Sequence, residues 1–279
     1  MAHWRNYLEV AKTGQHTVAG TLKVLPALRS PQLGNRRDLL VWLPPSYGQG
    51  DARYAVLYVH DGQNLFDEAT SYAGEWQVDE TMQALSLEGL EAIVVGIPNA
   101  GEQRPCEYSP FADWPEQDGR GEAYLAFVVD TVKPLIDRDF RTLADRAHTG
   151  IMGSSLGGLI SLFAFFHCAQ VFGLAGAISP AFEPTPQEML GYVEQAPFVP
   201  GRVYMDVGTR EAASGPRQTR EEQAESRAYL ASVRQMRDVL LRKGYRRGTD
   251  LCYLQERGGI HHESAWARRL PGAIKFLLG

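Results

Sequence analysis

The apolar positions of the chain follow two different periods. Continuous apolar runs at 55–60 and 92–97 are typical of strands that are buried on both faces of a parallel sheet. Residues 17–25 alternate in part at a period of two, and residues 38–43 form a short apolar run before two prolines. We therefore expect the chain to begin with a pair of antiparallel strands and to continue into a parallel sheet.

Stretches with helical spacing of apolar residues separate these runs. The pattern predicts helices at 76–87, 122–140, 156–168, 218–243 and 263–278, and further strands at 147–152, 172–178, 203–207 and 251–254. Pro134 should kink or interrupt the second helix. Strands that alternate with helices indicate the α/β class, with a mostly parallel central sheet and helices on both faces.

Two proline-rich stretches, 99–120 and 180–200, show neither period. Long irregular segments in a compact domain are often lids or binding loops, so we expect these two to flank a site. We find no internal repeat and no low-complexity linker. The 279 residues are therefore interpreted as one domain, 1–279.

Composition excludes several classes of protein. Hydrophobic residues make up 44% and charged residues 22%, which are values of an ordinary folded chain. The net charge is −5 and the basic residues are scattered, so we expect no nucleic-acid partner. The three cysteines, Cys106, Cys168 and Cys252, have the spacing of neither a disulfide framework nor a zinc site.

The start of the chain predicts where the protein resides. No apolar segment follows the first residues, so we expect no secretory signal. Nor does any uninterrupted apolar run approach the roughly 18 residues of a membrane span. The expected location is the cytoplasm, without a membrane partner; the oligomeric state stays open, a homodimer included.

The segment Gly153-Ser154-Ser155-Leu156-Gly157 has the form G-x-S-x-G between a predicted strand and a predicted helix. In this context the motif indicates a nucleophile elbow, in which glycines let the chain turn sharply and expose the hydroxyl of Ser155. The N–H of Leu156 would then be the first oxyanion donor. The alternative is that these residues merely cap a helix.

A serine nucleophile needs a base, and the base is usually a histidine held by a carboxylate. After the elbow helix the histidines are His261 and His262, in a glycine-containing loop that follows the last predicted strand. Glu211 lies just beyond the strand at 203–207 and Asp206 lies inside it, so either is a candidate acid. Spacing alone does not choose within these two pairs.

The chain closely resembles the putative-esterase family of α/β-hydrolases, which includes enterochelin esterases, esterase D, feruloyl esterases and mycolyltransferases. The resemblance covers most of the chain. It is carried by the elbow and by the segments His60–Asp67, Glu75-Trp76, Arg104, Glu107–Pro110, Ser179-Pro180, Asp206–Glu211, His261 and Trp266.

The resemblance implies roles for particular residues. Family members place the catalytic histidine five residues before the tryptophan, which points to His261, and the acid three residues after the strand-end glycine, which points to Glu211. Many relatives have Asp where this chain has Glu211. The second oxyanion donor of the family corresponds by position to the N–H of Gln63.

The resulting hypothesis is a serine esterase that cleaves a small-molecule carboxylic ester through an acyl-enzyme, without a cofactor or metal. The alternatives are an acyltransferase or a thioesterase similar to S-formylglutathione hydrolase on the same fold, or a non-catalytic binding protein. Several side chains flank the predicted site and are candidates for substrate binding: Trp76, Arg104, Glu107, Tyr108 and Trp114.

Overall fold

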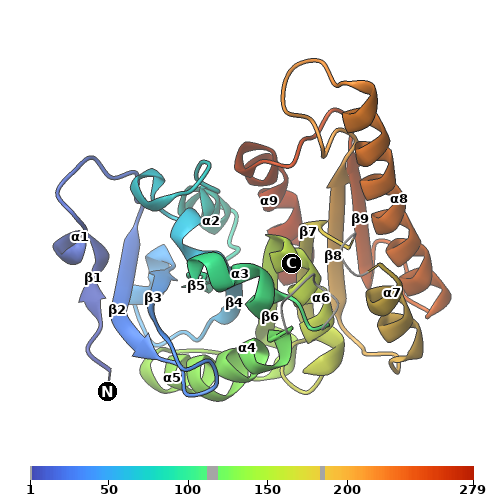
Figure 1. The fold of residues 1–279 in the computed structure, drawn as a ribbon. Coiled ribbons are helices and arrows are strands. Elements are labelled where there is room, and N and C mark those ends of the chain that lie inside the picture. Colours follow the sequence, from blue (N-terminus) through green and yellow to red (C-terminus); the bar gives the residue numbers. More distant parts are fainter. Residues whose placement is uncertain (1, 112–118, 183–185) are drawn as a thin grey trace.

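The computed structural model describes residues 2–111, 119–182 and 186–279. Within these ranges, nine strands form one sheet in the order β1-β2-β3-β5-β4-β6-β7-β8-β9 (Figure 1). The strands are β1 (Arg5–Asn6), β2 (Thr21–Arg29), β3 (Arg36–Leu43), β4 (Ala55–His60), β5 (Ala92–Ile97), β6 (Thr149–Ser155), β7 (Leu174–Pro180), β8 (Arg202–Gly208) and β9 (Leu251–Glu256).

The pairing of the strands confirms the predicted sheet. β2 runs antiparallel to β3, and β3 runs antiparallel to β5. From β4 to β9 every neighbouring pair is parallel. The carboxyl ends of these six strands therefore meet at one edge, where α/β sheets carry their binding sites.

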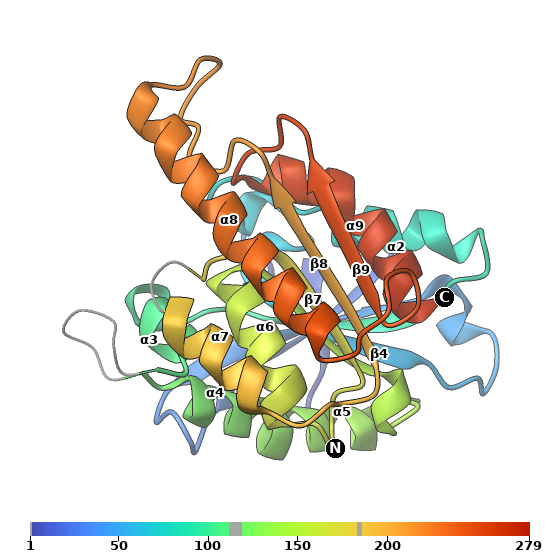
Figure 2. The same cartoon turned by 90° about the vertical axis from the view of Figure 1, so that its right-hand side faces the viewer.

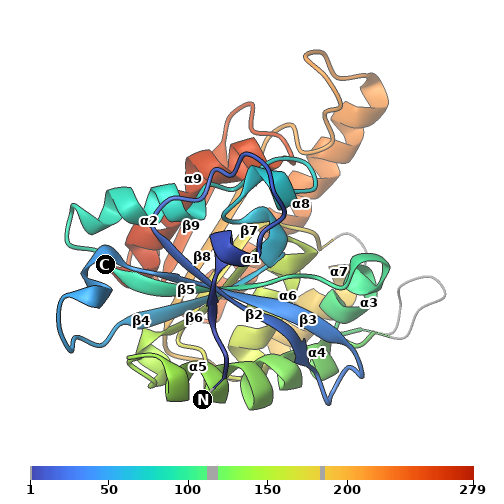
Figure 3. The same cartoon turned by 90° about the vertical axis from the view of Figure 1, so that its left-hand side faces the viewer.

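The helices divide the core into two layers. They are α1 (Tyr7–Val10), α2 (Val78–Ser86), α3 (Arg104–Tyr108), α4 (Gly121–Phe127), α5 (Lys133–Asp139), α6 (Leu156–His167), α7 (Pro186–Gln195), α8 (Arg220–Arg242) and α9 (Glu263–Leu278). In Figure 3, α2 and α9 lie on one side of the sheet and α4 and α5 on the other. Across the described residues, none of the helices combines the length and the apolar character that a membrane crossing requires.

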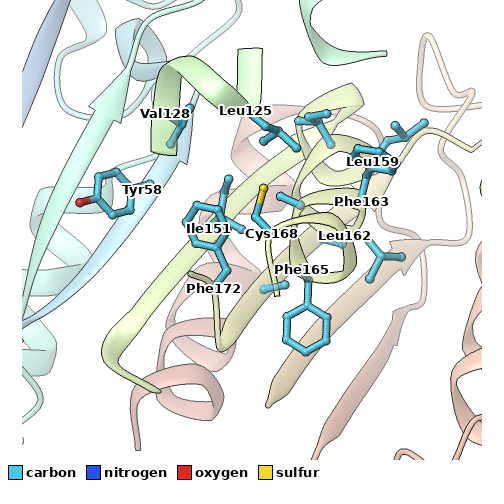
Figure 4. Close-up of a cluster of buried hydrophobic side chains, with 14 of the residues drawn as sticks. Tyr58, Leu125, Val128, Ile151, Leu159, Leu162, Phe163, Phe165, Cys168 and Phe172 are labelled. Atoms are coloured by element: carbon cyan, nitrogen blue, oxygen red, sulfur yellow. The ribbon is translucent and has the colours of Figure 1, made fainter. Parts of the chain in front are cut away.

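Side chains of each buried strand alternate between these two layers. Val56 and Tyr58 of β4 join the core under α4 to α8, whereas Leu57 and Val59 join the core under α2 and α9. Figure 4 shows part of the first core, in which Tyr58 lies among aliphatic and aromatic side chains. Because both faces are covered, the central strands are apolar at consecutive positions, as their sequence predicted.

Two segments differ from the sequence prediction. The helix expected at 122–140 is divided into α4 and α5 by a π-helical turn at Val128–Val132, directly before Pro134. This wider turn accommodates the proline, which lacks an N–H and crowds the preceding turn. The irregular stretch expected at 180–200 contains α7, which packs against the long helix α8 (Figure 2).

The junction between β6 and α6 turns at a single residue. Ser155 ends the strand with φ 57° and ψ −125°, a backbone conformation that is strained for a residue with a side chain. A Cβ added at Gly153 would lie 2.8 Å from the carbonyl carbon of Gly157 and 2.8 Å from His60 Cδ2. The sharp turn therefore depends on the missing side chain of Gly153.

A group of three carboxylates lies where α2 meets the N-terminal segment. Side-chain oxygens of Glu75, Asp79 and Glu80 all lie within 4.8 Å of one another. Asp79 is fully buried, and its Oδ2 accepts a hydrogen bond of 2.6 Å from the N–H of Ala19. Burial, together with the neighbouring Glu80, raises the pKa of Asp79 to about 8; burial likewise raises the pKa of Glu75 to about 7. These acids bind protons more tightly in the folded chain than in the unfolded chain.

This group predicts a stability that falls as the pH rises. The contribution of Asp79 is complete below its unfolded pKa of about 3.9 and is lost as the pH rises through its folded pKa of about 8. Between pH 5 and pH 8 the wild type should lose on the order of 1–3 kcal/mol more unfolding free energy than Asp79→Asn, which cannot ionise. Urea unfolding at both pH values measures the difference, with Glu225→Gln on the exposed face of α8 as the control. Parallel pH profiles for wild type and Asp79→Asn would contradict this account.

A second prediction concerns the elbow. Gly153→Ala should lower the unfolding free energy by about 1–3 kcal/mol, because its Cβ would meet backbone atoms that cannot move aside. Gly191→Ala in α7 is the matched control, since nothing lies within 4 Å of its added Cβ, and it should be neutral or stabilising by up to about 1 kcal/mol. Thermal unfolding of both variants tests the difference, and equal melting temperatures would show that the elbow tolerates a side chain.

Candidate active site

A cavity of about 890 Å³ opens at the carboxyl edge of the sheet. It lies where β4, β5 and β6 end, and it contains both Ser155 and His261. The residues that line it are Asp61, Gln63, Asn64, Thr70, Ser71, Tyr72, Pro98, Asn99, Gly101, Glu102, Arg104, Ser154, Ser155, His261, Glu263 and Trp266. The topology therefore brings the elbow serine and one of the two late histidines to the same space.

His261 reaches the cavity on the loop that follows β9. Its Nδ1 lies 2.8 Å from Glu211 Oε2. An ionised carboxylate can only accept a hydrogen bond, so Nδ1 carries the proton and the neutral ring keeps its lone pair on Nε2. Trp266 packs edge-on against the ring at a centroid distance of 5.0 Å and helps to fix its orientation.

The neighbouring His262 has a different position. It is the N-cap residue of α9, and its Nδ1 accepts a hydrogen bond of 3.2 Å from the N–H of Ser264. A side chain that caps a helix satisfies one of the free N–H groups of the first turn. Sequence spacing did not choose between the two histidines. In the structure, His261 lines the cavity and His262 caps α9.

Glu211 is buried and held by several donors. Its Oε1 accepts a hydrogen bond of 2.7 Å from Ser179 Oγ and another from the N–H of Gly208, while Oε2 contacts His261. Burial alone would raise the pKa of the Glu211 carboxyl, but the hydrogen bond and charge of His261 and these further donors outweigh it and lower the pKa. The carboxylate is therefore ionised where it meets the imidazole.

Asp206, the other candidate acid, faces different partners. It accepts hydrogen bonds of 3.0 Å from the N–H of Ser179 and 3.0 Å from the hydroxyl of Tyr204. Arg269 Nη1 lies 3.4 Å from its Oδ1. Burial raises the pKa of Asp206 to about 6, against the lowering effect of Arg269. Asp206 thus serves as a buried counter-ion of Arg269, whereas the carboxylate that contacts His261 is that of Glu211.

Arg269 and Ser179 connect the two carboxylates. Arg269 Nη2 donates a hydrogen bond of 2.9 Å to Ser179 Oγ, which in turn donates to Glu211. Sequence reasoning quoted Ser179 as part of a family motif but gave it no role, and it missed Arg269. The signal that could have identified Arg269 is its position on the apolar side of the predicted helix at 263–278. Charged side chains are seldom buried unpaired, so an arginine there needs an acidic partner.

The loop after β4 forms the other side of the cavity. Asp61 adopts the left-handed conformation, with φ 55°, and both of its carboxylate oxygens bind Arg104, at 2.7 and 2.8 Å. A Cβ added at Gly62 would lie 2.6 Å from the carbonyl carbon of Gly96, so the loop packs tightly against β5. Gln63 follows within the same short turn, and its side-chain oxygen accepts a hydrogen bond of 3.1 Å from the N–H of Asn99.

Several expected substrate-binding residues are placed elsewhere, and these expectations are corrected. Trp76 is 2% exposed and packs on Trp266 at 5.6 Å between ring centroids. Glu107 is fully buried and binds Arg37 at 2.9 Å. Tyr108 is fully buried as well. The position of a residue in the sequence predicts that it lies near the site, but it does not predict whether its side chain points into the cavity or into the protein core.

Arg104 does line the cavity, where its charge is matched by Asp61. Trp114 lies outside the described residues. Tyr72, Asn99, Glu102 and Glu263 line the cavity without having been predicted. For Asn99 a signal existed, because it follows directly after the β5 run that the sequence identified as a parallel strand.

The described residues contain one set of three acidic side chains close enough to share a cation, Glu75, Asp79 and Glu80. None of them is among the residues that line the cavity. The cavity itself brings together a hydroxyl and an imidazole, and the imidazole contacts the buried carboxylate of Glu211. These are the groups that nucleophilic acyl transfer needs.

Comparison of the sequence with known proteins shows the family to which the chain belongs. The model of the putative esterase family matches residues 30–277. The uncharacterized protein YbbA of Bacillus subtilis (strain 168) is 29% identical over 263 residues, which cover 91% of this chain and 96% of YbbA.

Two solved structures share the fold. The siderophore hydrolase EstB from Aspergillus nidulans is similar with a TM-score of 0.72 at 18% identity, covering 96% of this chain and 98% of EstB. An IroE-like serine hydrolase from Shewanella oneidensis has a TM-score of 0.67 at 18% identity, covering 92% of this chain and 80% of the other. The predicted α/β-hydrolase fold is thereby confirmed. The chain belongs to the putative esterase family and is a carboxylic ester hydrolase.

Proposed function

We propose that the protein is a serine esterase for small-molecule carboxylic esters, with Ser155 as nucleophile, His261 as general base and Glu211 as the acid of the triad. The observation that carries this proposal is the 2.8 Å contact between His261 Nδ1 and the buried Glu211 Oε2, beside a strained serine that lines the same cavity as His261. The siderophore hydrolase among the structural neighbours supports a small ester as substrate, without identifying it.

In the first step, Ser155 Oγ attacks the ester carbonyl carbon while His261 Nε2 takes the hydroxyl proton. The C–O bond to the alcohol then breaks, and the alcohol leaves with that proton. The positive charge that forms on the imidazole is stabilised by Glu211, which the neighbouring donors keep ionised. Water repeats the cycle on the acyl-enzyme and releases the carboxylic acid.

The negative charge on the carbonyl oxygen needs donors that are already in place. Leu156 is the first residue of α6, so its N–H lacks a partner within the helix and lies at the positive end of the helix dipole. The N–H of Gln63, in the turn that Asp61 and Arg104 hold, is the second donor of this proposal. One such donor is typically worth about 10²–10³ in kcat.

The first test is the loss of the nucleophile. Wild type should release p-nitrophenol from acetate and butyrate esters and should be labelled by a fluorophosphonate, because the hydroxyl of Ser155 is activated by a base. Ser155→Ala should lose the labelling and on the order of 10³-fold or more of kcat. Circular dichroism of both proteins controls for folding. Equal turnover by a folded Ser155→Ala protein would refute the proposed nucleophile.

The choice of acid has its own test. Glu211→Gln should lower kcat by on the order of 10²–10⁴, because the amide no longer stabilises the imidazolium and can donate to the wrong ring nitrogen. Asp206→Asn is the matched comparison. It should destabilise the fold through the unpaired Arg269 and should lower kcat less than Glu211→Gln does. A larger loss of kcat in a folded Asp206→Asn protein would reverse the two assignments.

A further inference from the structure

The cavity has carboxylates whose charge no basic side chain of the described residues matches. Among the residues that line it, the charged side chains besides His261 are Asp61, Glu102, Arg104 and Glu263. Arg104 is bound by both oxygens of Asp61, so these two charges cancel each other. The charge that the cavity presents to a ligand is therefore that of Glu102 and Glu263, and it is negative.

Glu263 differs from Glu102 in its burial. It is the first residue of α9 and is 7% exposed, whereas Glu102 is exposed to solvent. The described part of the chain provides no hydrogen-bond donor and no basic side chain to the Glu263 carboxylate. The N-terminus of α9 stabilises a nearby anion only weakly. A mostly buried side chain that presents an unpaired carboxylate to the cavity favours a cation that can enter there.

Two aromatic residues line the same cavity as this carboxylate. Trp266 is three residues further along α9 and lines the same cavity, and Tyr72, which is 92% exposed, lines it as well. The loop that carries Tyr72 lies against Glu263, because a Cβ added at Gly74 would be 3.8 Å from Glu263 Cβ. The faces of tryptophan and tyrosine attract organic cations, so their position agrees with the charge of Glu263.

We propose that Glu263 is the binding residue for a positively charged group of the substrate, so that the enzyme prefers esters that carry an ammonium group over neutral and anionic esters of the same shape. This inference rests on the proposed esterase function and adds the class of its substrate. It gives Glu263 a role in binding and none in the bond-breaking steps.

Three acetate esters of similar size test the preference. Their alcohols are 4-(aminomethyl)benzyl alcohol, 4-ethylbenzyl alcohol and 4-carboxybenzyl alcohol, which are cationic, neutral and anionic at pH 7.5. The wild type should hydrolyse the cationic ester with a kcat/KM roughly tenfold above that of the neutral ester, and the anionic ester should be the slowest. The preference should weaken at high salt, because salt screens charges.

Substitutions then identify the residue. Glu263→Gln should reduce the ratio of kcat/KM for the cationic and neutral esters to about one, with the change mainly in KM. Glu225→Gln, on the exposed face of α8, should leave the ratio unchanged. A wild-type ratio of one or less overturns the inference, and so does a preference that disappears in Glu102→Gln but persists in Glu263→Gln.

Binding without turnover separates this inference from the proposed function. Calorimetry with 4-methylbenzylammonium and 4-methylbenzoate needs no hydrolysis, so it decides the question even if none of the three esters is cleaved. The cation should bind the wild type at least about fivefold more tightly than it binds Glu263→Gln, and the anion should bind less tightly than the cation. Equal binding of both ions, or of the cation to both proteins, overturns the proposal while leaving the Ser155 test untouched.

Discussion

The single-residue turn at Ser155 is the constraint on which the site depends. A strand of a parallel sheet must end and a helix must begin around one residue with φ 57°, and neighbouring backbone segments must come close together. That approach is possible only because Gly153 has no side chain, since a Cβ there would lie 2.8 Å from the carbonyl carbon of Gly157 and 2.8 Å from His60 Cδ2. Strain of this kind, about 1–3 kcal/mol, persists only where the surrounding packing enforces it. The buried strands and the apolar helix α6 provide that packing.

The charges behind the site are divided between two neighbouring carboxylates. Asp206 and Glu211 belong to one strand and the loop after it, yet one faces Arg269 and the other faces His261. Ser179 lies between the two carboxylates: its N–H donates a hydrogen bond to Asp206, and its hydroxyl donates one to Glu211. Without Asp206 the buried Arg269 would keep, among the described residues, only Glu256, at 3.7 Å, as an acidic partner, and without Ser179 the Oε1 of Glu211 would lose a donor. The Asp206–Arg269 pair thus supports the Glu211–His261 pair through Ser179.

The sequence predicted the sheet and the elbow because both depend on local patterns. Continuous apolar runs and the glycines around Ser155 are readable without tertiary contacts. The environment of a side chain, in contrast, depends on tertiary contacts that no local pattern shows. Trp76 begins a predicted helix and Glu107 lies in a predicted irregular stretch, but both side chains are buried and neither lines the cavity. The helix α7 was not predicted, because its stretch contains several prolines. Which of His261 and His262 reaches the cavity depends on where α9 begins, and spacing alone does not determine a helix boundary within one or two residues.

The first turn of α9 combines three tasks in six residues. His261 meets Glu211, His262 caps the helix, and Glu263 and Trp266 line the cavity beside them. The cap fixes where the helix begins, and the imidazole just before the cap is held by Glu211 and by the indole of Trp266, which belongs to the same helix as Glu263. A substrate group held at Glu263 would therefore be held at a set position relative to the base. In an enzyme of this kind, binding energy far from the reacting bond is useful when the elements that bind and the elements that react are rigidly joined.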